Sequence, residues 1–216
     1  MIGSGHARTV HAMTEARSPG PAAIADAARH LDAALRALGV APEGPHLVGT
    51  PERVAALWAE LFAGRDPADA PDLGAFPNPS PGAGLVVAAG LPFHSMCAHH
   101  LLPFFGRASV AYLPGASIVG LGVLPRLVDH HARRPTLQED VAAGVADDLE
   151  RALAPRGVAV LLVARHLCME MRGARKRGRV ETALWRGAFE SDATLRGEFL
   201  AAARGPARRA AAGDGR

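Results

Sequence analysis

The sequence predicts an α+β domain in which helical segments come first and antiparallel strands follow. Helical periodicity occupies residues 21–38 and 50–64, near the start of the chain. β-Branched runs at 158–171 and 180–189 lie far downstream, with a helical pair at 124–132 and 139–153 before them. This order is typical of an α+β fold and differs from βαβ alternation. With 216 residues, the chain is long enough for one sizeable core.

The helical predictions rest on apolar spacing and on residues that start or stop helices. Ile24, Leu31 and Leu35 recur on one face of the first segment, and Gly39 is expected to end it. In the second segment we expect Thr50 to cap the helix, with proline following at the first helical position. A last helix is predicted at 194–203.

The strand predictions divide the rest of the chain. Strands are expected to begin at 85–87, to continue at 108–113, and to include one long central strand over 158–171. Residues 65–84 are rich in Pro, Gly, Asp and Ala and read as a connection. We therefore divide the chain into four parts. These are a disordered N-terminal tail (1–20), a helical region with its connection (21–84), a main domain (85–204) and a disordered basic C-terminal tail (205–216).

Composition and charge exclude several classes of protein. No apolar run approaches the length of about 18 residues that spans a bilayer, and the N-terminus lacks the apolar core of a secretory signal. A cytoplasmic protein without a membrane partner is expected. The formal net charge is +3, and the arginines of the C-terminal tail have no aromatic residues between them. We interpret that tail as solvated and expect no nucleic-acid partner.

Two short clusters of cysteine and histidine stand apart from the rest of the sequence. In Cys97-Ala98-His99-His100, the spacing of Cys97 and His100 brings both side chains together on one turn. In His166-Leu167-Cys168, alternation along the predicted strand would place His166 and Cys168 on the same face.

These residue types suit a zinc ion with three protein ligands and one open position. Cys97, His100 and Cys168 would supply the ligands, and His99 and His166 would flank the site as acid–base groups. The alternative is that both cysteines are buried in a core without a metal, since free cysteine is among the most buried residue types. Spacing alone leaves both interpretations open.

The surroundings of the two clusters resemble the GTP cyclohydrolase I family, from about residue 22 to residue 204. The resemblance is carried by Thr50-Pro51-Glu52-Arg53-Val54-Ala55, Ser95-Met96-Cys97-Ala98-His99-His100-Leu101, Gly106 to Pro114, Arg133-Arg134-Pro135-Thr136-Leu137-Gln138-Glu139, His166-Leu167-Cys168-Met169-Glu170-Met171-Arg172-Gly173, and Thr194-Leu195-Arg196-Gly197-Glu198-Phe199-Leu200. It implies the tunnelling fold, or T-fold, preceded by N-terminal helices. It also implies a homo-oligomeric ring, typically a decamer, with active sites at subunit interfaces.

The resemblance also implies the roles of particular residues. Zn²⁺ would be held by Cys97, His100 and Cys168, and His99 and His166 would be the catalytic histidines. Glu139 matches the glutamate that holds the guanine ring, a task for which a carboxylate is suited because it accepts two N–H donors. Further substrate-binding positions implied by the match are Gln138, Arg53, Arg126 and Arg172.

The implied reaction is hydrolysis of GTP at C8 of the purine. A histidine protonates N7, water adds to C8 and formate leaves. The ribose then opens and recloses onto the base to give 7,8-dihydroneopterin triphosphate, an entry step of folate and pterin biosynthesis.

The sequence departs from the family pattern at four positions near the clusters. Ala98 replaces the glutamate of Cys-Glu-His-His, Gly122 and Val123 replace Ser-Lys, and Asp140 replaces the arginine of Gln-Glu-Arg. One interpretation is drift within an active enzyme. A second is a divergent paralogue that takes a less phosphorylated nucleotide or stops at a ring-opened product. A third is a zinc-binding subunit without catalysis.

Other histidines and the tryptophans have simpler interpretations. His94 is expected to be packed or solvated near the metal loop, and His130 and His131 are expected on an exposed helix surface. Trp58 and Trp185 are interpreted as anchors of a core or an interface.

Overall fold

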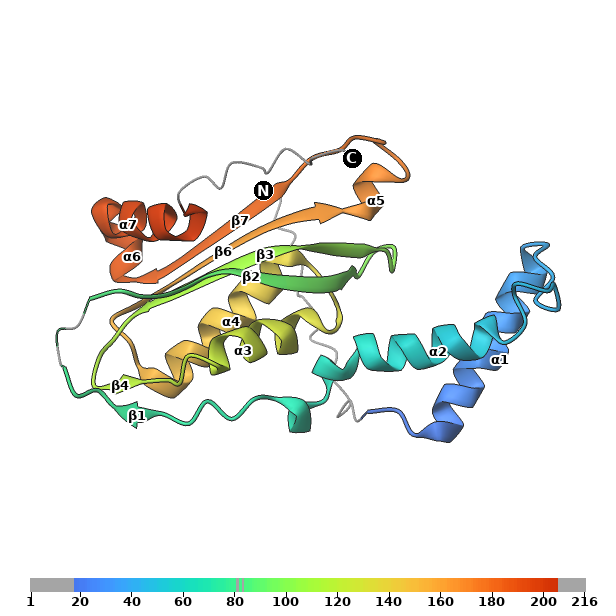
Figure 1. The fold of residues 1–216 in the computed structure, drawn as a ribbon, viewed down its shortest axis with the longest axis horizontal. Helices are drawn as coiled ribbons and strands as arrows, with labels where there is room; N and C mark the ends of the chain where they lie inside the picture. The colour runs from blue at the N-terminus through green and yellow to red at the C-terminus, as the bar shows by residue number, and fades with distance from the viewer. Residues whose placement is uncertain (1–17, 81, 83, 206–216) are drawn as a thin grey trace, which may run out of the picture.

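The structure, a computed structural model, describes residues 18–80, 82 and 84–205 (Figure 1). The disorder predicted for the two tails falls almost entirely on residues outside these ranges. Among the described residues, no helix is both long and apolar enough to cross a membrane.

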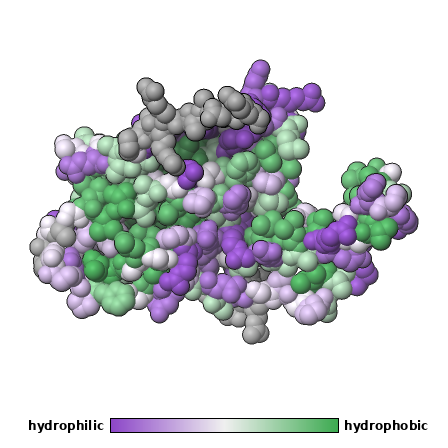
Figure 2. All heavy atoms as spheres, in the orientation of Figure 1, coloured by the Kyte–Doolittle hydropathy of each residue, from purple (hydrophilic) through white to green (hydrophobic). Residues whose placement is uncertain are grey.

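The described chain begins with a helical hairpin that stands away from the rest of the molecule (Figure 1). It consists of α1 (Pro21–Ala37) and α2 (Thr50–Leu61), which pack against each other. The capping prediction at Thr50 is wrong, because Thr50 is already helical and Gly49, with φ 73°, is the N-cap. Apolar and polar side chains both reach the surface of this hairpin (Figure 2). Its exposed large apolar residues are Leu38, Val40, Val48 and Leu57.

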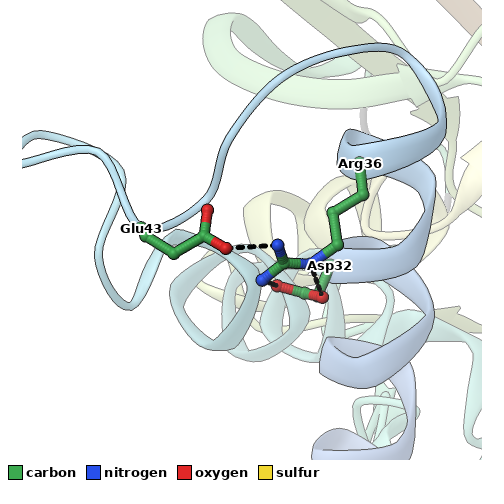
Figure 3. A network of polar contacts seen from close by, with 3 residues as sticks. All are labelled: Asp32, Arg36 and Glu43. Atoms are coloured by element: carbon green, nitrogen blue, oxygen red, sulfur yellow. Dashed lines mark hydrogen bonds and ion pairs between the residues drawn. The ribbon is translucent and has the colours of Figure 1, made fainter.

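A network of charged groups connects the end of α1 to the loop that follows it. The guanidinium of Arg36 donates to Asp32 one turn earlier at 2.8 Å and also to Glu43 in the loop (Figure 3). These two carboxylates raise the pKa of Arg36, and Arg36 lowers the pKa of Glu43. The network is solvent-exposed, so we assign it a local role in fixing the loop.

The main part of the molecule is a five-stranded sheet with the order β5-β2-β3-β6-β7. Its long strands are antiparallel neighbours, as predicted: β2 (Val86–Cys97), β3 (Pro103–Leu113), β6 (Gly157–His166) and β7 (Val180–Gly187). The short β5 (Pro135–Thr136) pairs in parallel with the end of β2. A separate two-stranded sheet joins β1 (Phe76–Pro77) to β4 (Ser117–Ile118), and η1 (Ala63–Arg65) and η2 (Pro67–Asp69) precede it.

The prediction of one strand over residues 158–171 is confirmed up to His166 and wrong for residues 167–171. Strand β6 ends at His166, which pairs with Phe104, and the chain then turns into the short helix α5 (Leu167–Glu170). The neighbouring strand β3 starts at Pro103, which has no N–H to extend the ladder. The pairing of β3 with β6 therefore ends at His166, the predicted active-site histidine.

Helices cover both faces of the sheet (Figure 1). On one face, α3 (Val123–Ala132) and α4 (Gln138–Leu153) bury Leu127 and Leu149 completely. On the other face, α6 (Ala188–Ser191) and α7 (Ala193–Arg204) enclose a smaller cluster around Phe189 and Phe199. Trp185 packs on both of these rings, which agrees with its predicted role as an anchor. The α+β prediction is confirmed.

His131 is not on an exposed surface, contrary to the sequence prediction. Its side chain is 12% exposed between α3 and α4, and its Nε2 lies 2.7 Å from Asp148 Oδ2. Burial lowers the pKa of His131, although the Asp148 carboxylate opposes that shift. The ring fits because α4 has a glycine opposite it: a Cβ on Gly144 would lie 2.3 Å from Nδ1 of His131.

We predict that Gly144→Ala lowers the free energy of unfolding by about 2 kcal/mol. Alanine favours a helix by about 1 kcal/mol, but overpacking costs about 1–3 kcal/mol and a displaced ring loses its bond to Asp148. Gly197→Ala in α7 is the matched control, because a Cβ there meets nothing within 4 Å. Chemical denaturation should show the control unchanged or stabilised. Equal stability of the two variants would contradict the tight packing of His131.

Candidate metal centre and active site

The first ligand cluster lies in a tight turn at the end of β2. Cys97 is the last residue of the strand, and its carbonyl accepts from the N–H groups of His100 at 3.3 Å and Leu101 at 2.8 Å. Leu101 has φ 50°, a conformation that costs a non-glycine residue free energy. The turn is closed when Cys97 N donates to Leu102 O at 2.9 Å. This backbone holds the side chains of Cys97 and His100 on the same side, with Cys97 Sγ 3.8 Å from His100 Nδ1.

The second cluster joins the first from the end of β6. Cys168 lies in α5, directly after the strand, and its Sγ falls within 4.8 Å of the ligand atoms of Cys97 and His100. The predicted trio is therefore together, but Cys168 reaches it from a helical turn and not from a strand. Burial and the neighbouring Cys97 thiol raise the pKa of Cys168.

The three ligand atoms are close enough together for a tetrahedral zinc site. Zn–S bonds of about 2.3 Å and Zn–N bonds of about 2.0–2.1 Å at tetrahedral angles separate ligand atoms by about 3.6–3.8 Å. The separation of 3.8 Å between Cys97 Sγ and His100 Nδ1 agrees with this range. The other ligand atoms lie within 4.8 Å of one another, so a small change of side-chain rotamer would bring them to bonding positions. Two thiolates and an imidazole are soft ligands of the kind that zinc prefers.

His166 stands beside the three ligands and is held from two sides. Its ring stacks on Phe104 with the planes 1° apart and the centroids 4.7 Å apart. Its Nε2 lies 2.8 Å from Oε1 of Gln138. Burial lowers the pKa of His166, and the nearby charge of Glu139 acts in the opposite direction.

Gln138 is buried, and its amide is fully used inside the protein. The residue is 2% exposed, and three acceptors lie within hydrogen-bond distance of the two hydrogens on its Nε2: the carbonyl oxygens of Leu162 and Val180, both at 3.1 Å, and Thr182 Oγ1 at 3.0 Å. Carbonyl oxygens only accept, so Oε1 is the atom that faces His166 and accepts its Nε2–H. His166 is thereby fixed with its proton on Nε2 and an open lone pair on Nδ1. The sequence match assigned Gln138 to the substrate, whereas the structure uses its amide to orient His166.

Three other predicted residues surround this group and are exposed. Glu139 follows Gln138 in the first turn of α4, close enough for its charge to act on His166. Arg172 follows α5, and its positive charge partly opposes the upward shift in the pKa of Cys168. His99 lies in the turn after β2, with its ring centroid 6.1 Å from that of His100. The parallel pairing of Cys97 with Thr136 brings the start of α4 to these two turns.

Two predicted substrate residues lie elsewhere in the chain. Arg53 is on α2 and donates to Val48 O at 3.0 Å and Thr50 Oγ1 at 2.7 Å, both on its own hairpin. Arg126 is on α3 and lines a cavity of about 470 Å³ together with Asp129 and Arg133. None of the three cluster ligands lines that cavity.

The departures from the family pattern have clear structural positions. Val123 is 6% exposed and packs in the main core, whereas Gly122 is exposed at the N-cap of α3. Asp140 is exposed in the first turn of α4, where the helix dipole favours an acidic residue. Ala98 is exposed in the turn after β2 and donates its N–H to Thr136 O at 3.1 Å.

Comparison with known proteins assigns this arrangement to a family. A family model described as GTP cyclohydrolase I matches residues 27–204. The chain belongs to the GTP cyclohydrolase I family. The GTP cyclohydrolase 1 of Lactiplantibacillus plantarum is 44% identical over 168 residues, covering 77% of this chain and 88% of the relative. That of Deinococcus radiodurans is 43% identical over 175 residues, covering 81% of each, and that of Geobacillus kaustophilus is 46% identical over 170 residues, covering 77% and 89%.

Within this GTP cyclohydrolase I chain, sequence reasoning missed residues that support the histidine and the turn. Phe104 contacts His166 only because the register of β3 and β6 pairs these two positions. Thr136 is buried beside Cys97 for the same kind of reason. A cross-strand register is not visible in a single sequence. The positive φ of Leu101 likewise has no sequence signal, since leucine rarely adopts it.

We predict that Gln138→Leu lowers the free energy of unfolding by about 2 kcal/mol, because it leaves buried carbonyl groups and His166 without their partner. Nitrogen-15 NMR of histidine-labelled protein should show neutral His166 protonated at Nε2, and a mixture of tautomers in the variant. Thr182→Val is the control, since it removes one of the acceptors around the amide nitrogen and leaves the bond to His166. The same mixed tautomer in the unmodified protein would contradict this arrangement.

Proposed function

We propose that this chain is a zinc-dependent GTP cyclohydrolase I that hydrolyses GTP at C8, releasing formate and 7,8-dihydroneopterin triphosphate. The observation that carries the proposal is the convergence of Cys97, His100 and Cys168 within 4.8 Å beside His166, in a chain of this family.

In this proposal Cys97, His100 and Cys168 hold the zinc ion and leave one position open. A zinc ion in such a site supplies Lewis acidity that lowers the pKa of a water molecule to about 7. The buried Cys97 and the close turn around it exclude other water from the thiolate side. The protein therefore supplies three fixed ligands and an approach for substrate from the exposed side of His100.

His166 and His99 carry the proton transfers in this proposal. The Gln138 contact keeps the Nε2 proton of His166 in place, so Nδ1 is the atom that accepts a proton from, or returns one to, the reacting purine. His99 is exposed and stands next to His100 in the same turn, so it faces the entering substrate. Ring opening, loss of formate and ribose rearrangement each move protons, and two histidines with different surroundings suit this sequence of steps.

The nucleotide is recognised by charged residues in the proposal. The Glu139 carboxylate accepts two N–H donors from the guanine edge, and the exposed guanidinium of Arg172 binds a phosphate. Arg53 and Arg126 lie elsewhere in this chain and would contact a substrate held by a neighbouring copy. We therefore propose a homo-oligomer with active sites between subunits, a ring and specifically a decamer, located in the cytoplasm.

Product analysis tests the proposal. We predict that zinc-loaded protein converts GTP to formate and 7,8-dihydroneopterin triphosphate, detected by mass spectrometry. Cys168→Ala should lower the rate at least about 100-fold, because water is no longer activated. A protein that binds zinc but transforms no guanine nucleotide would contradict the proposed reaction.

A second candidate differs in the number of phosphates on the substrate. It is favoured by the burial of Val123 and by the exposed carboxylate of Asp140, which both remove positive charge from positions that match phosphate contacts. A faster reaction with GDP or GMP than with GTP, or accumulation of a ring-opened product, would select this candidate.

We predict that Asp140→Arg lowers KM for GTP by about tenfold and changes KM for GMP much less. A charge-assisted contact to phosphate is worth about 1.5–3 kcal/mol, while the loss of an acidic residue at the helix N-terminus costs about 0.3–1 kcal/mol of stability. Asp147→Arg, about two turns further along α4, is the control, and its ion pair with Arg186 at 3.8 Å is exposed. Equal KM changes for the two nucleotides would show that Asp140 lies away from the phosphates.

A further inference from the structure

An ion pair brackets Cys168 in the sequence and in space. The guanidinium of Arg165, near the end of β6, donates from Nε to Glu170 Oε1 at 2.8 Å and from its terminal nitrogen to Oε2 at 2.5 Å. This is the bidentate geometry in which the planar fork of arginine fits a carboxylate. Three residues after Arg165 comes Cys168, and two residues later comes Glu170. The pair thus closes a loop of chain around the candidate zinc ligand.

The helix that carries Cys168 needs such a contact. Helix α5 has only four residues, Leu167–Glu170, and a single turn is not stable by itself in water. It is followed by a glycine-containing and arginine-rich segment, residues 172–179, whose residues are nearly all exposed. The Glu170 side chain is 9% exposed although it is charged, so its carboxylate lies against the protein.

Arg165 is itself held by a row of rings across the sheet. Strand register places His94, Phe105 and Arg165 side by side on β2, β3 and β6. The rings of His94 and Phe105 stack with centroids 5.9 Å apart, and Cζ of Arg165 lies 5.6 Å from the centroid of Phe105. A cation over an aromatic face is attracted to it, so the contact with Phe105 helps to hold the guanidinium of Arg165 in the position from which it bonds to Glu170.

Alternation along the strands gives this row a partner on the opposite face of the sheet. The next residues on the same three strands are Ser95, Phe104 and His166, and Phe104 stacks on His166. The row that contains Phe104 orients His166 next to the candidate zinc ligands. The row that contains Phe105 orients Arg165, which bonds to Glu170 in the turn that carries Cys168.

We propose that Arg165 and Glu170 are positioning residues that hold Cys168 at the distance from Cys97 and His100 that a metal ion requires. The inference rests on the zinc centre of the proposed function and adds two residues to it. Neither residue ligates the metal in this proposal, and both act through the backbone of α5. Groups that orient metal ligands typically change metal affinity by about 10- to 100-fold when they are removed.

The test is the zinc affinity of purified full-length protein, measured by competition with a chelating dye. We expect Glu170→Gln and Arg165→Gln each to weaken zinc binding by about tenfold or more. The double variant should be no weaker than either single variant, because both changes break the same pair. Arg165→Lys keeps the charge, loses the fork and should give an intermediate value. If Glu170→Gln does not fold, Arg165→Lys serves as the test variant in its place.

Glu181→Gln is the matched control. Glu181 on β7 pairs with Arg204 at 3.3 Å, with side chains about half exposed, and is not among the clustered ligands. Its zinc affinity should equal that of the unmodified protein. Cobalt-substituted protein provides a second readout, since the thiolate-to-cobalt absorption should weaken in Glu170→Gln and stay unchanged in Glu181→Gln.

Zinc affinities of Glu170→Gln and Arg165→Gln within twofold of the unmodified protein would overturn the inference. Additive losses of zinc affinity in the double variant would also overturn it, because the two residues would then act independently and not as a pair. The proposed function is judged separately, by turnover of GTP in the unmodified protein. A protein that binds zinc tightly without turnover would contradict that reaction and leave the role of the pair to the affinity data.

Discussion

The buried amide of Gln138 joins three parts of the chain that are far apart in the sequence. It stands at the first residue of α4 and bonds to Leu162 on β6 and to Val180 and Thr182 on β7. Its remaining oxygen accepts from His166. An amide taken out of water needs these partners, so its position fixes the helix, the two strands and the histidine together. The candidate site depends on this single side chain more than on any other contact around it.

The two turns that carry the ligands are held by the same sheet. The short strand β5 pairs with the end of β2 and leads directly into Gln138, which places Cys97 next to the start of α4. Strand β6 ends at the level of Phe104, and the chain folds into α5 there. The site is therefore built where regular pairing stops. Backbone that no longer follows the ladder can bring Cys97, His100 and Cys168 toward one point.

The sequence predicted the helical and strand segments well because their apolar periodicity is strong. Spacing alone left the metal site and the buried-cysteine interpretations open, and the family resemblance selected Cys97, His100 and Cys168, which the structure brings together. Prediction from the sequence failed where long-range pairing decides the outcome. The predicted strand runs past His166 because the local pattern does not show that the partner strand β3 begins only at Pro103. His131 was placed at the surface because neither Asp148 nor the space left by Gly144 is visible from its local sequence. The two arginines at 53 and 126 match the family, but their hydrogen bonds are to Val48, Thr50 and Gly122 and not to the clustered ligands.

X-ray absorption at the zinc edge, on protein reconstituted with one zinc per chain, tests the central claim most directly. We predict a four-coordinate ion with two sulfur ligands at about 2.3 Å and one imidazole and one further light atom at about 2.0–2.1 Å. Cys168→Ala should reduce the sulfur contribution to one atom. A spectrum without sulfur ligands, or one unchanged by Cys168→Ala, would contradict the metal centre on which the proposed function depends.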